Sequence, residues 1–131
     1  MAVCVWDPVS HVSGVLHFLL PDSRVSPVRA KEQPAAFADA GIPLLLQSAA
    51  VYGLQNARCD VRIVGGAELG DGAAAFDVGK RNVLAAKNLL WRSGLSLKAA
   101  AVGGTTARAV AVSAGTGRVL VTTGRDHVDE L

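Results

Sequence analysis

The sequence has few cysteines and little net charge. Its two cysteines, Cys4 and Cys59, are too few for a disulfide framework, and we expect both to be free thiols in a reducing compartment. Its 13 basic and 11 acidic residues give a net charge of +2, which is too small and too scattered for a nucleic-acid-binding face or a polybasic membrane patch. These shortages argue against a disulfide-stapled scaffold and predict no nucleic-acid partner.

A long hydrophobic run is also missing. The longest apolar run near the N-terminus, residues 14–21, contains His17 and is far shorter than the ~20 residues that span a bilayer. No basic segment precedes this run and no small-residue cleavage site follows it, so a signal peptide is not indicated. We therefore predict no membrane insertion and a cytoplasmic location.

The patterns of nucleotide and metal sites are absent as well. The glycine pairs at residues 65–66 and 103–104 belong to neither a Gly-x-Gly-x-x-Gly nor a Walker pattern, and they indicate turns or close packing. His11 lies in a predicted turn, and His127 lies near acidic residues in an expected solvated tail. We predict no cofactor and no metal site.

What the sequence does contain suits one compact domain. Half of its 131 residues are hydrophobic and 18% are charged, a composition that favours a globular body over a disordered or fibrous chain. A chain of this length buries most of its apolar surface without staples. We expect a single domain over residues 1–131.

Apolar runs separated by turn residues predict five strands and two helices. Strands are expected at residues 2–6, 12–20, 60–64, 109–112 and 118–122, helices at residues 34–52 and 78–93, and a surface loop at residues 21–34. Because the first two strands are almost continuously hydrophobic, we expect them to form a hairpin that is buried on both faces. Pro43 is unfavourable inside a helix, so the first helix is expected either to begin near Gly41 or to break at Pro43.

The order of these elements predicts the fold class. It contains no regular repeat of strand, helix and strand, and hairpins are segregated from helices. We predict an α/β fold of the α+β type, in which mixed or largely antiparallel sheet layers are covered by two main helices.

His17 is the residue whose interpretation stays open at this point. It lies within the predicted second strand among apolar residues. A core histidine with a backbone partner fits this position, and so does a rigidly held general base that titrates near neutral pH. The residues alone do not decide between the two.

Two motifs early in the chain resemble those of a known enzyme family. Residues 1–8 read Met-Ala-Val-Cys-Val-Trp-Asp-Pro, and residues 14–21 read Gly-Val-Leu-His-Phe-Leu-Leu-Pro. In the CheD family of chemoreceptor glutamine deamidases, Gly-Ser-Cys is followed by Val-Ala-Val-Cys-x-x-Asp-Pro and then by Gly-x-x-His-x-x-Leu-Pro. The two segments are in register with this pattern, so the chain resembles a CheD deamidase.

Later segments extend the resemblance over nearly the whole chain. Each is short, and their joint order and spacing carry the match; they lie at residues 37–39, 42–45, 65–67, 78–82, 102–104 and 116–119. The resemblance implies a CheD-like fold for the entire domain.

The resemblance also implies a reaction and its partners. In that family a cysteine thiolate attacks the carboxamide of a receptor glutamine, ammonia leaves, and water hydrolyses the thioester to give glutamate. The family histidine, which activates the thiol and protonates the ammonia, corresponds to His17. The implied partners are the cytoplasmic domain of methyl-accepting chemoreceptors and a CheC-type phosphatase. The alternative is a non-enzymatic adaptor that binds receptors or this phosphatase without turnover.

The nucleophile of the family has no counterpart in this chain. The family segment Thr-x-Gly-x-Gly-Ser-Cys would end directly before Met1, so we expect a reading frame that was begun too late or a gene that has lost its first segment. Cys4 lies four positions beyond the expected nucleophile, about 13 Å along a strand. We therefore predict that Cys4 is a core residue, that Cys59 is structural, and that the chain as printed lacks the residue needed for activity.

Overall fold

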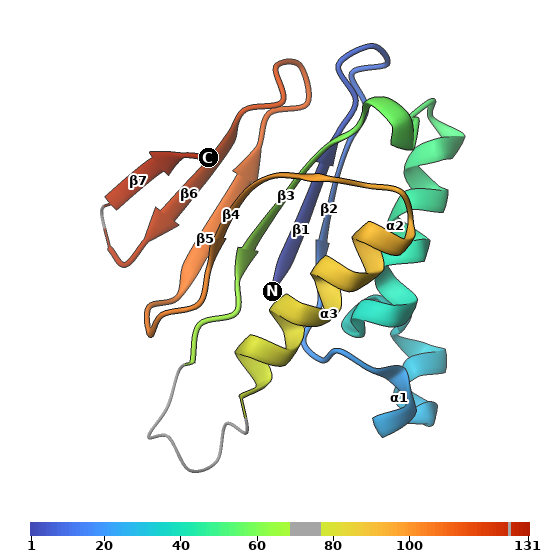
Figure 1. The fold of residues 1–131 in the computed structure, drawn as a ribbon, viewed down its shortest axis with the longest axis vertical. Helices are drawn as coiled ribbons and strands as arrows, with labels where there is room; N and C mark the ends of the chain where they lie inside the picture. The colour runs from blue at the N-terminus through green and yellow to red at the C-terminus, as the bar shows by residue number, and fades with distance from the viewer. Residues whose placement is uncertain (69–76, 126) are drawn as a thin grey trace.

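The described part of the chain forms two β-sheets and three α-helices arranged in three layers. The computed structural model describes residues 1–68, 77–125 and 127–131. Figure 1 shows the helices on one side, a four-stranded sheet in the middle and a three-stranded sheet on the other side. The strands are β1 (Ala2–Trp6), β2 (Ser13–His17), β3 (Asp60–Gly65), β4 (Leu97–Val102), β5 (Arg108–Val112), β6 (Val119–Thr123) and β7 (His127–Glu130), and the helices are α1 (Pro27–Glu32), α2 (Ala38–Val51) and α3 (Val78–Arg92). The predicted fold class is confirmed.

The four-stranded sheet has the order β2-β1-β3-β4. Strand β1 is antiparallel to both β2 and β3, whereas β3 and β4 are parallel and are joined through α3. The sheet is therefore mixed. The sequence prediction missed β4 because its residues, Leu-Lys-Ala-Ala-Ala-Val, are rich in alanine, which has a low preference for strands.

Strand β1 separates two hydrophobic clusters formed by described residues. Val3 and Val5 point into the cluster beneath α2 and α3, while Ala2 and Cys4 point into the cluster between the two sheets. This alternation explains why β1 is buried on both faces, as predicted. The same prediction was wrong for β2, an edge strand that buries Leu16 but exposes its neighbour Val15.

Helix α2 contains Pro43 without interruption. It runs from Ala38 to Val51, so the expectation of a start near Gly41 or a break at Pro43 was wrong. The helix buries three side chains against the sheet at intervals of about one helical turn, namely Ile42, Leu46 and Ala49. This packing stabilises the helix enough to offset the hydrogen bond that proline cannot donate.

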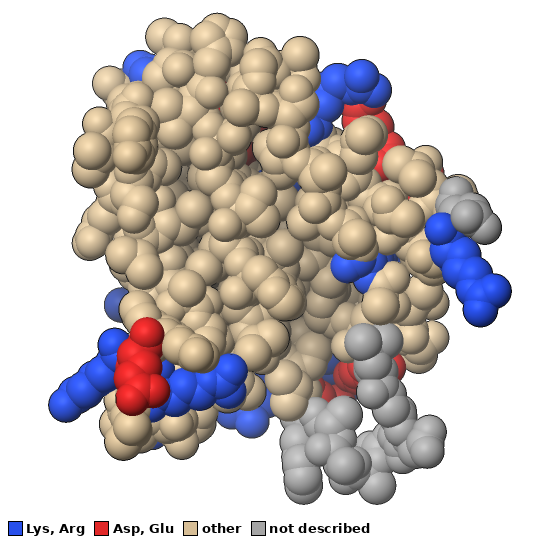
Figure 2. Space-filling view, turned by 180° about the vertical axis from the view of Figure 1, so that it is seen from behind, with Lys and Arg blue, Asp and Glu red and all other residues tan. Residues whose placement is uncertain are grey.

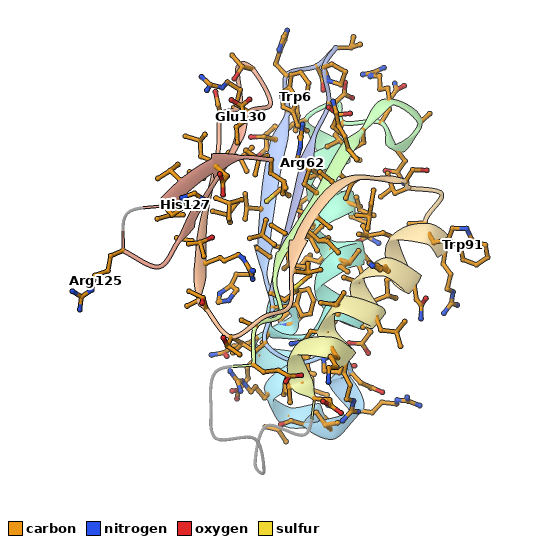
Figure 3. The ribbon with its side chains drawn as sticks, turned by 60° about the vertical axis from the view of Figure 1, so that its left-hand side comes forward. Trp6, Arg62, Trp91, Arg125, His127 and Glu130 are labelled. Atoms are coloured by element: carbon orange, nitrogen blue, oxygen red, sulfur yellow. The ribbon has the colours of Figure 1, made fainter. Side chains whose placement is uncertain are left out.

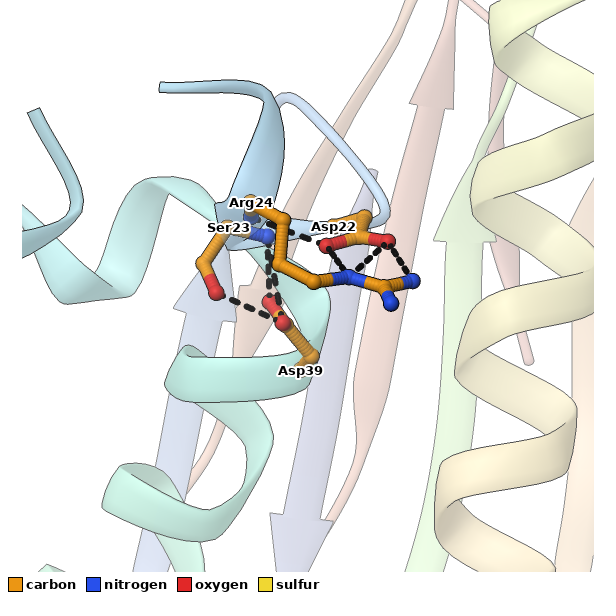
Figure 4. Close-up of polar contacts among 4 residues, drawn as sticks. All are labelled: Asp22, Ser23, Arg24 and Asp39. Atoms are coloured by element: carbon orange, nitrogen blue, oxygen red, sulfur yellow. Dashed lines mark hydrogen bonds and ion pairs between the residues drawn. The ribbon is translucent and has the colours of Figure 1, made fainter. Parts of the chain in front are cut away.

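The segment before α2 is more ordered than the predicted loop. It holds the short helix α1 and is attached to α2 through Asp39, whose carboxylate accepts hydrogen bonds from the backbone N–H (2.9 Å) and the hydroxyl (2.7 Å) of Ser23. Next to this contact, Asp22 accepts hydrogen bonds from the backbone N–H and the guanidinium of Arg24 (Figure 4). These contacts order the chain between β2 and α2.

The second sheet has the order β5-β6-β7 and packs on the first around Trp6. The Trp6 indole lies against Gly117 and donates a hydrogen bond to the Ala114 carbonyl at 2.8 Å. Arg62, buried between the sheets (Figure 3), donates a hydrogen bond to the Gly117 carbonyl at 3.3 Å. The expected tail around His127 is instead strand β7, paired with β6, and His127 lies 2.9 Å from the carboxylate of Asp129.

None of the helices in the described part of the chain combines the length and the apolar character that a membrane crossing requires.

Candidate active site

A cleft of about 460 Å³ opens where β2 and β3 end and α3 begins. Its walls come from five parts of the chain, namely Met1, residues 17–19, residues 65–68, three residues of α3 (Val78, Gly79 and Asn82), and residues 107–108 before and at the start of β5. His17 is the residue in these walls that the sequence singled out. The cleft therefore gathers the segments that the resemblance marked at residues 14–21, 65–67 and 78–82.

His17 is the last residue of β2 and lies opposite Ala2 of β1. Because side chains alternate across a strand, its imidazole projects to the same face of the sheet as Ala2, toward the second sheet. It also borders a smaller cavity of about 310 Å³, whose other wall includes Arg108 and Val110 of β5. His17 is exposed rather than buried, so its interpretation as a core histidine was wrong.

The electrostatic environment of His17 favours its neutral form. Partial burial lowers the pKa of His17 below its usual 6.5. Within residues 1–68, 77–125 and 127–131, the ring has no hydrogen-bond partner. A neutral imidazole with an available nitrogen is what a general base requires near pH 7.

Backbone contacts on both sides of Phe18 fix the strand that carries His17. The Phe18 N–H donates a hydrogen bond to the Met1 carbonyl at 3.0 Å, and the Met1 nitrogen donates one to the Phe18 carbonyl at 3.1 Å. Beyond it, the Leu19 N–H donates to the Ala36 carbonyl at 2.9 Å, and the Leu19 carbonyl accepts from Asn82. The β1–β2 ladder thus continues through Met1 and Phe18 to the floor of the cleft.

Asn82 is a residue of this site whose role the sequence did not reveal. It is 5% exposed, and its Nδ2 donates a 2.9 Å hydrogen bond from α3 to the Leu19 carbonyl. Its Oδ1 is buried and has no hydrogen-bond donor among the described residues. The signal available in the sequence was a polar residue on the buried side of an amphipathic helix, a position where a partner is required.

Close approach of two glycines holds the start of α3 against the end of β3. A Cβ on Gly79 would lie 2.3 Å from the Gly66 carbonyl oxygen, and Gly66 itself has φ +66°. Gly65, with φ +109°, passes Met1 so closely that a Cβ would lie 3.3 Å from the Met1 Cα. The prediction of turn or close-packing glycines at 65–66 is confirmed.

Neither cysteine is placed as a nucleophile for His17. Cys4 lies on the same face of the sheet as His17, so the distance between their side chains is a weaker argument against Cys4 as the nucleophile than the sequence suggested. The stronger argument is burial, because Cys4 is only 2% exposed in the core between the sheets. Burial raises the pKa of Cys4 to about 11, which keeps the thiol protonated. Cys59 precedes β3, at the end of that strand opposite the cleft, and burial raises the pKa of its thiol too. The prediction of a core Cys4 is confirmed.

Comparison with known proteins gives a consistent result. The family described as CheD chemotactic sensory transduction matches residues 19–123. A probable chemoreceptor glutamine deamidase CheD of Solibacter usitatus is 41% identical over 91% of this chain and 70% of its own length. A second such protein, of Anaeromyxobacter dehalogenans, is 40% identical over 95% of this chain and 78% of its own length. The chemoreceptor glutamine deamidase CheD of Thermotoga maritima is 34% identical over 92% of this chain and 74% of its own length.

Proposed function

This chain belongs to the CheD family, and we propose that it is a protein-glutamine deamidase that converts glutamine side chains of methyl-accepting chemoreceptors to glutamate. The observation that carries the proposal is the position of His17, which combines a neutral, unpaired imidazole with the wall of the cleft. Relatives that bear the name of this activity supply the substrate class.

His17 acts as the proton carrier of the reaction. It accepts the proton of a cysteine thiol as the sulfur bonds to the glutamine carboxamide carbon, and it returns this proton to the nitrogen as the carbon–nitrogen bond breaks and ammonia leaves. It then takes a proton from the water that attacks the thioester, so that the products are a glutamate side chain and the regenerated thiol. A neutral imidazole at the outset fits the first of these steps.

The register of the β1–β2 ladder supports a nucleophile directly before Met1. Because Ala2 lies opposite His17 and Met1 opposite Phe18, the preceding residue of a longer chain would lie opposite Leu19. Its side chain would then share the sheet face of His17, as a diagonal neighbour with Cα atoms roughly 7–8 Å apart. A cysteine sulfur and an imidazole nitrogen reach one another across that separation.

The substrate and regulatory partners follow from the same proposal. The receptor domain that carries the target glutamines is cytoplasmic, so the deamidase acts in the cytoplasm. A CheC-type phosphatase is the second partner, on the strength of the resemblance in residues 1–8 and 14–21.

The test is ammonia release from a purified chemoreceptor cytoplasmic fragment. A chain extended by the upstream Gly-Ser-Cys segment is expected to release ammonia and to convert glutamine to glutamate by mass spectrometry. The change His17→Ala should lower kcat by about 100-fold or more, the usual contribution of a general base. His17 is exposed, so the variant is expected to keep the thermal stability of the parent.

Two results would overturn the assignment. Full turnover by His17→Ala would remove His17 from the mechanism, and full turnover by the chain as printed would place the nucleophile elsewhere. Tight receptor binding without any ammonia release from the extended chain would support the adaptor function instead.

A further inference from the structure

The exposed side of α3 carries a continuous stripe of long side chains. Lys80, Leu84, Lys87 and Trp91 follow one another at spacings of four, three and four residues, which places them on one face of a helix. This face points away from the sheet, since the buried residues of α3 are Gly79, Asn82, Ala86 and Leu90. We refer to these four exposed residues as the α3 stripe.

The apolar members of the α3 stripe have no partner within the described chain. Leu84 is 60% exposed and Trp91 is 78% exposed. Figure 3 shows Trp91 projecting outward from the far end of α3. An exposed tryptophan is costly to leave in water and is the side chain most enriched at the energetic centres of protein interfaces, so the stripe has the character of a binding surface.

The charge on α3 is entirely positive. The helix contains Lys80, Arg81, Lys87 and Arg92 and no acidic residue. Lys80 is paired with Asp77 at 3.0 Å and with Glu68 at 3.5 Å, whereas Arg81, Lys87 and Arg92 make no ion pair with described residues. Cations near the start of a helix oppose its dipole, so helix stability does not account for Lys80 and Arg81.

Helix α2, which packs beside α3 in the same layer, differs from it in charge. Residues 33–57, which include α2, contain a single charged residue, Asp39. In Figure 2, which views the molecule from behind, most of the surface carries no charged side chain and the charges gather toward its margins. The positive charge thus belongs to α3 and is not shared by the helix beside it.

Grooves lie on both sides of Leu84. One, of about 430 Å³, runs between α3 and the chain from Pro21 to the first turn of α2, and its lining includes the charged residues Asp22, Arg24, Asp39, Arg81 and Arg92. The other, of about 240 Å³, lies between α3 and the end of β4 and includes Val83 and Val102. A ridge between two grooves is the shape that receives the side chains of another helix.

The α3 stripe leads away from the cleft that contains His17. The first turn of α3 lines the cleft through Val78 and Gly79, and Gly66 borders both the cleft and the smaller groove. From Lys80 to Trp91 the stripe extends about 16 Å along the helix axis, given a rise of ~1.5 Å per residue. A helix bound along the stripe would therefore lie beside the mouth of the cleft.

We propose that the α3 stripe is the surface on which this protein holds an acidic, amphipathic helix of its receptor substrate. The proposal rests on the proposed deamidase function and adds where the substrate binds. Carboxylates of the bound helix face Lys87, Arg81 and Arg92, and its apolar residues cover Leu84 and Trp91. A membrane surface fits less well, because only two apolar side chains project from the stripe and the grooves beside Leu84 break a flat contact.

The test compares changes in the stripe with matched changes elsewhere. Trp91→Ala is paired with Tyr52→Ala, an equally exposed aromatic at the end of α2, and Lys87→Glu is paired with Arg125→Glu, an exposed arginine between β6 and β7. Binding of a chemoreceptor cytoplasmic fragment is measured by calorimetry at low and high salt, and deamidation is measured by ammonia release with the upstream segment present. Thermal melts confirm that every variant is folded.

Each stripe variant is expected to raise Kd and KM for the receptor fragment about tenfold or more, with little change in kcat. The loss in Lys87→Glu should shrink at high salt, while the paired controls should match the parent. A short glutamine peptide, which does not span the stripe, should be affected far less.

The outcomes separate the two proposals. Equal receptor binding by parent, Trp91→Ala and Lys87→Glu would overturn the docking surface and leave the deamidase function intact. Weaker binding by the stripe variants with no deamidation by the parent would support the surface and refute the enzyme. Loss of binding to anionic lipid vesicles, with receptor binding unchanged, would assign the stripe to a membrane and overturn the proposal.

Discussion

At the scale of single residues, the ionisation of His17 is the property that determines what this site can do. Burial of part of the ring disfavours the imidazolium. Near pH 7 the histidine is therefore neutral and able to accept a proton. Because burial lowers the pKa of His17 only in the folded protein, protonation of His17 is coupled to unfolding.

We expect the pKa of His17 in the folded protein to lie below 6.5 when its ring is titrated by NMR, with the resonance assigned through His17→Gln. Since the unfolded value is about 6.5, the unfolded chain binds more protons between the two values. Protonation of His17 therefore does not reduce the free energy of unfolding above pH 6.5, and it reduces this free energy increasingly as the pH falls from 6.5 through the folded pKa. His17→Gln should remove this part of the pH dependence of urea unfolding. A pKa at or above 6.5 would contradict the electrostatic environment described for the site.

The sequence predicted the site unevenly at this scale. Periodicity alone did not separate a core histidine from a base at position 17, because the exposure of a strand residue depends on whether another layer covers its face of the sheet. The flanking motifs supplied that decision. Asn82 stayed unrecognised because its partner is a backbone carbonyl 63 positions away in sequence. Burial of Cys4 was predicted correctly from the habits of free cysteine.

At the scale of elements, the contact between α3 and the end of β3 shapes the cleft. Glycine is needed at position 79 because the Gly66 carbonyl occupies the space of a Cβ. The helix start, with Asn82 one turn further on, is thereby brought to the floor of the cleft.

Gly79→Ala is expected to destabilise the protein by about 1–3 kcal/mol, the usual cost of forcing an extra methyl group into a packed contact. This sign is opposite to the ordinary effect of alanine in a helix, which favours alanine over glycine by up to about 1 kcal/mol. Urea unfolding measures this change in the free energy of unfolding. The rate at which the protein deamidates a receptor fragment should also fall, because the substitution displaces the walls of the cleft. Gly115→Ala, where a Cβ meets nothing within 4 Å, is the control and should be close to neutral. A Gly79→Ala protein more stable than the parent would refute the close contact.

The sequence predicted the helices and strands whose apolar residues recur with a clear period, and it did not predict those without such a period. Strands β1 and β3 and helix α3 have clear apolar periodicity, and their bounds agree with the prediction to within about two residues, the usual uncertainty at element ends. Strand β7 reads His-Val-Asp-Glu, which has no apolar face and forms only because β6 offers an edge. Strand β7 forms because β6 is beside it, and the sequence of residues 127–130 alone therefore does not predict a strand.

At the scale of the whole molecule, the second sheet is held to the first by a small set of contacts around Trp6. Gly117 lies against the indole ring, which leaves no room for a side chain, and it has φ +68°. Both features tie the β5–β6 turn to β1.

Gly117→Ala is expected to cost more free energy of unfolding than Gly124→Ala. Both glycines have nearly the same positive φ, +68° and +67°, so both substitutions carry the backbone strain. Only at position 117 would the new Cβ lie 2.3 Å from the Trp6 ring, since nothing lies within 4 Å at position 124. We expect the difference, about 1–3 kcal/mol by urea unfolding, to vanish in a Trp6→Ala background. A difference that persists there would place the clash elsewhere.

The position of β1 in the middle of its sheet has a consequence for synthesis on the ribosome. Its first neighbour, β2, follows within a few residues, but its second neighbour, β3, spans residues 60–65, and β4 ends only at residue 102. At ~5–20 residues per second, the β1–β2 hairpin waits for seconds with one edge of β1 unpaired and its apolar side chains uncovered. Synthesis of the residues up to the end of β4, rather than formation of the hairpin, therefore limits how soon the nascent chain can become native. Strand β1, which leads into the candidate cleft, is thus made well before the strands that complete its sheet.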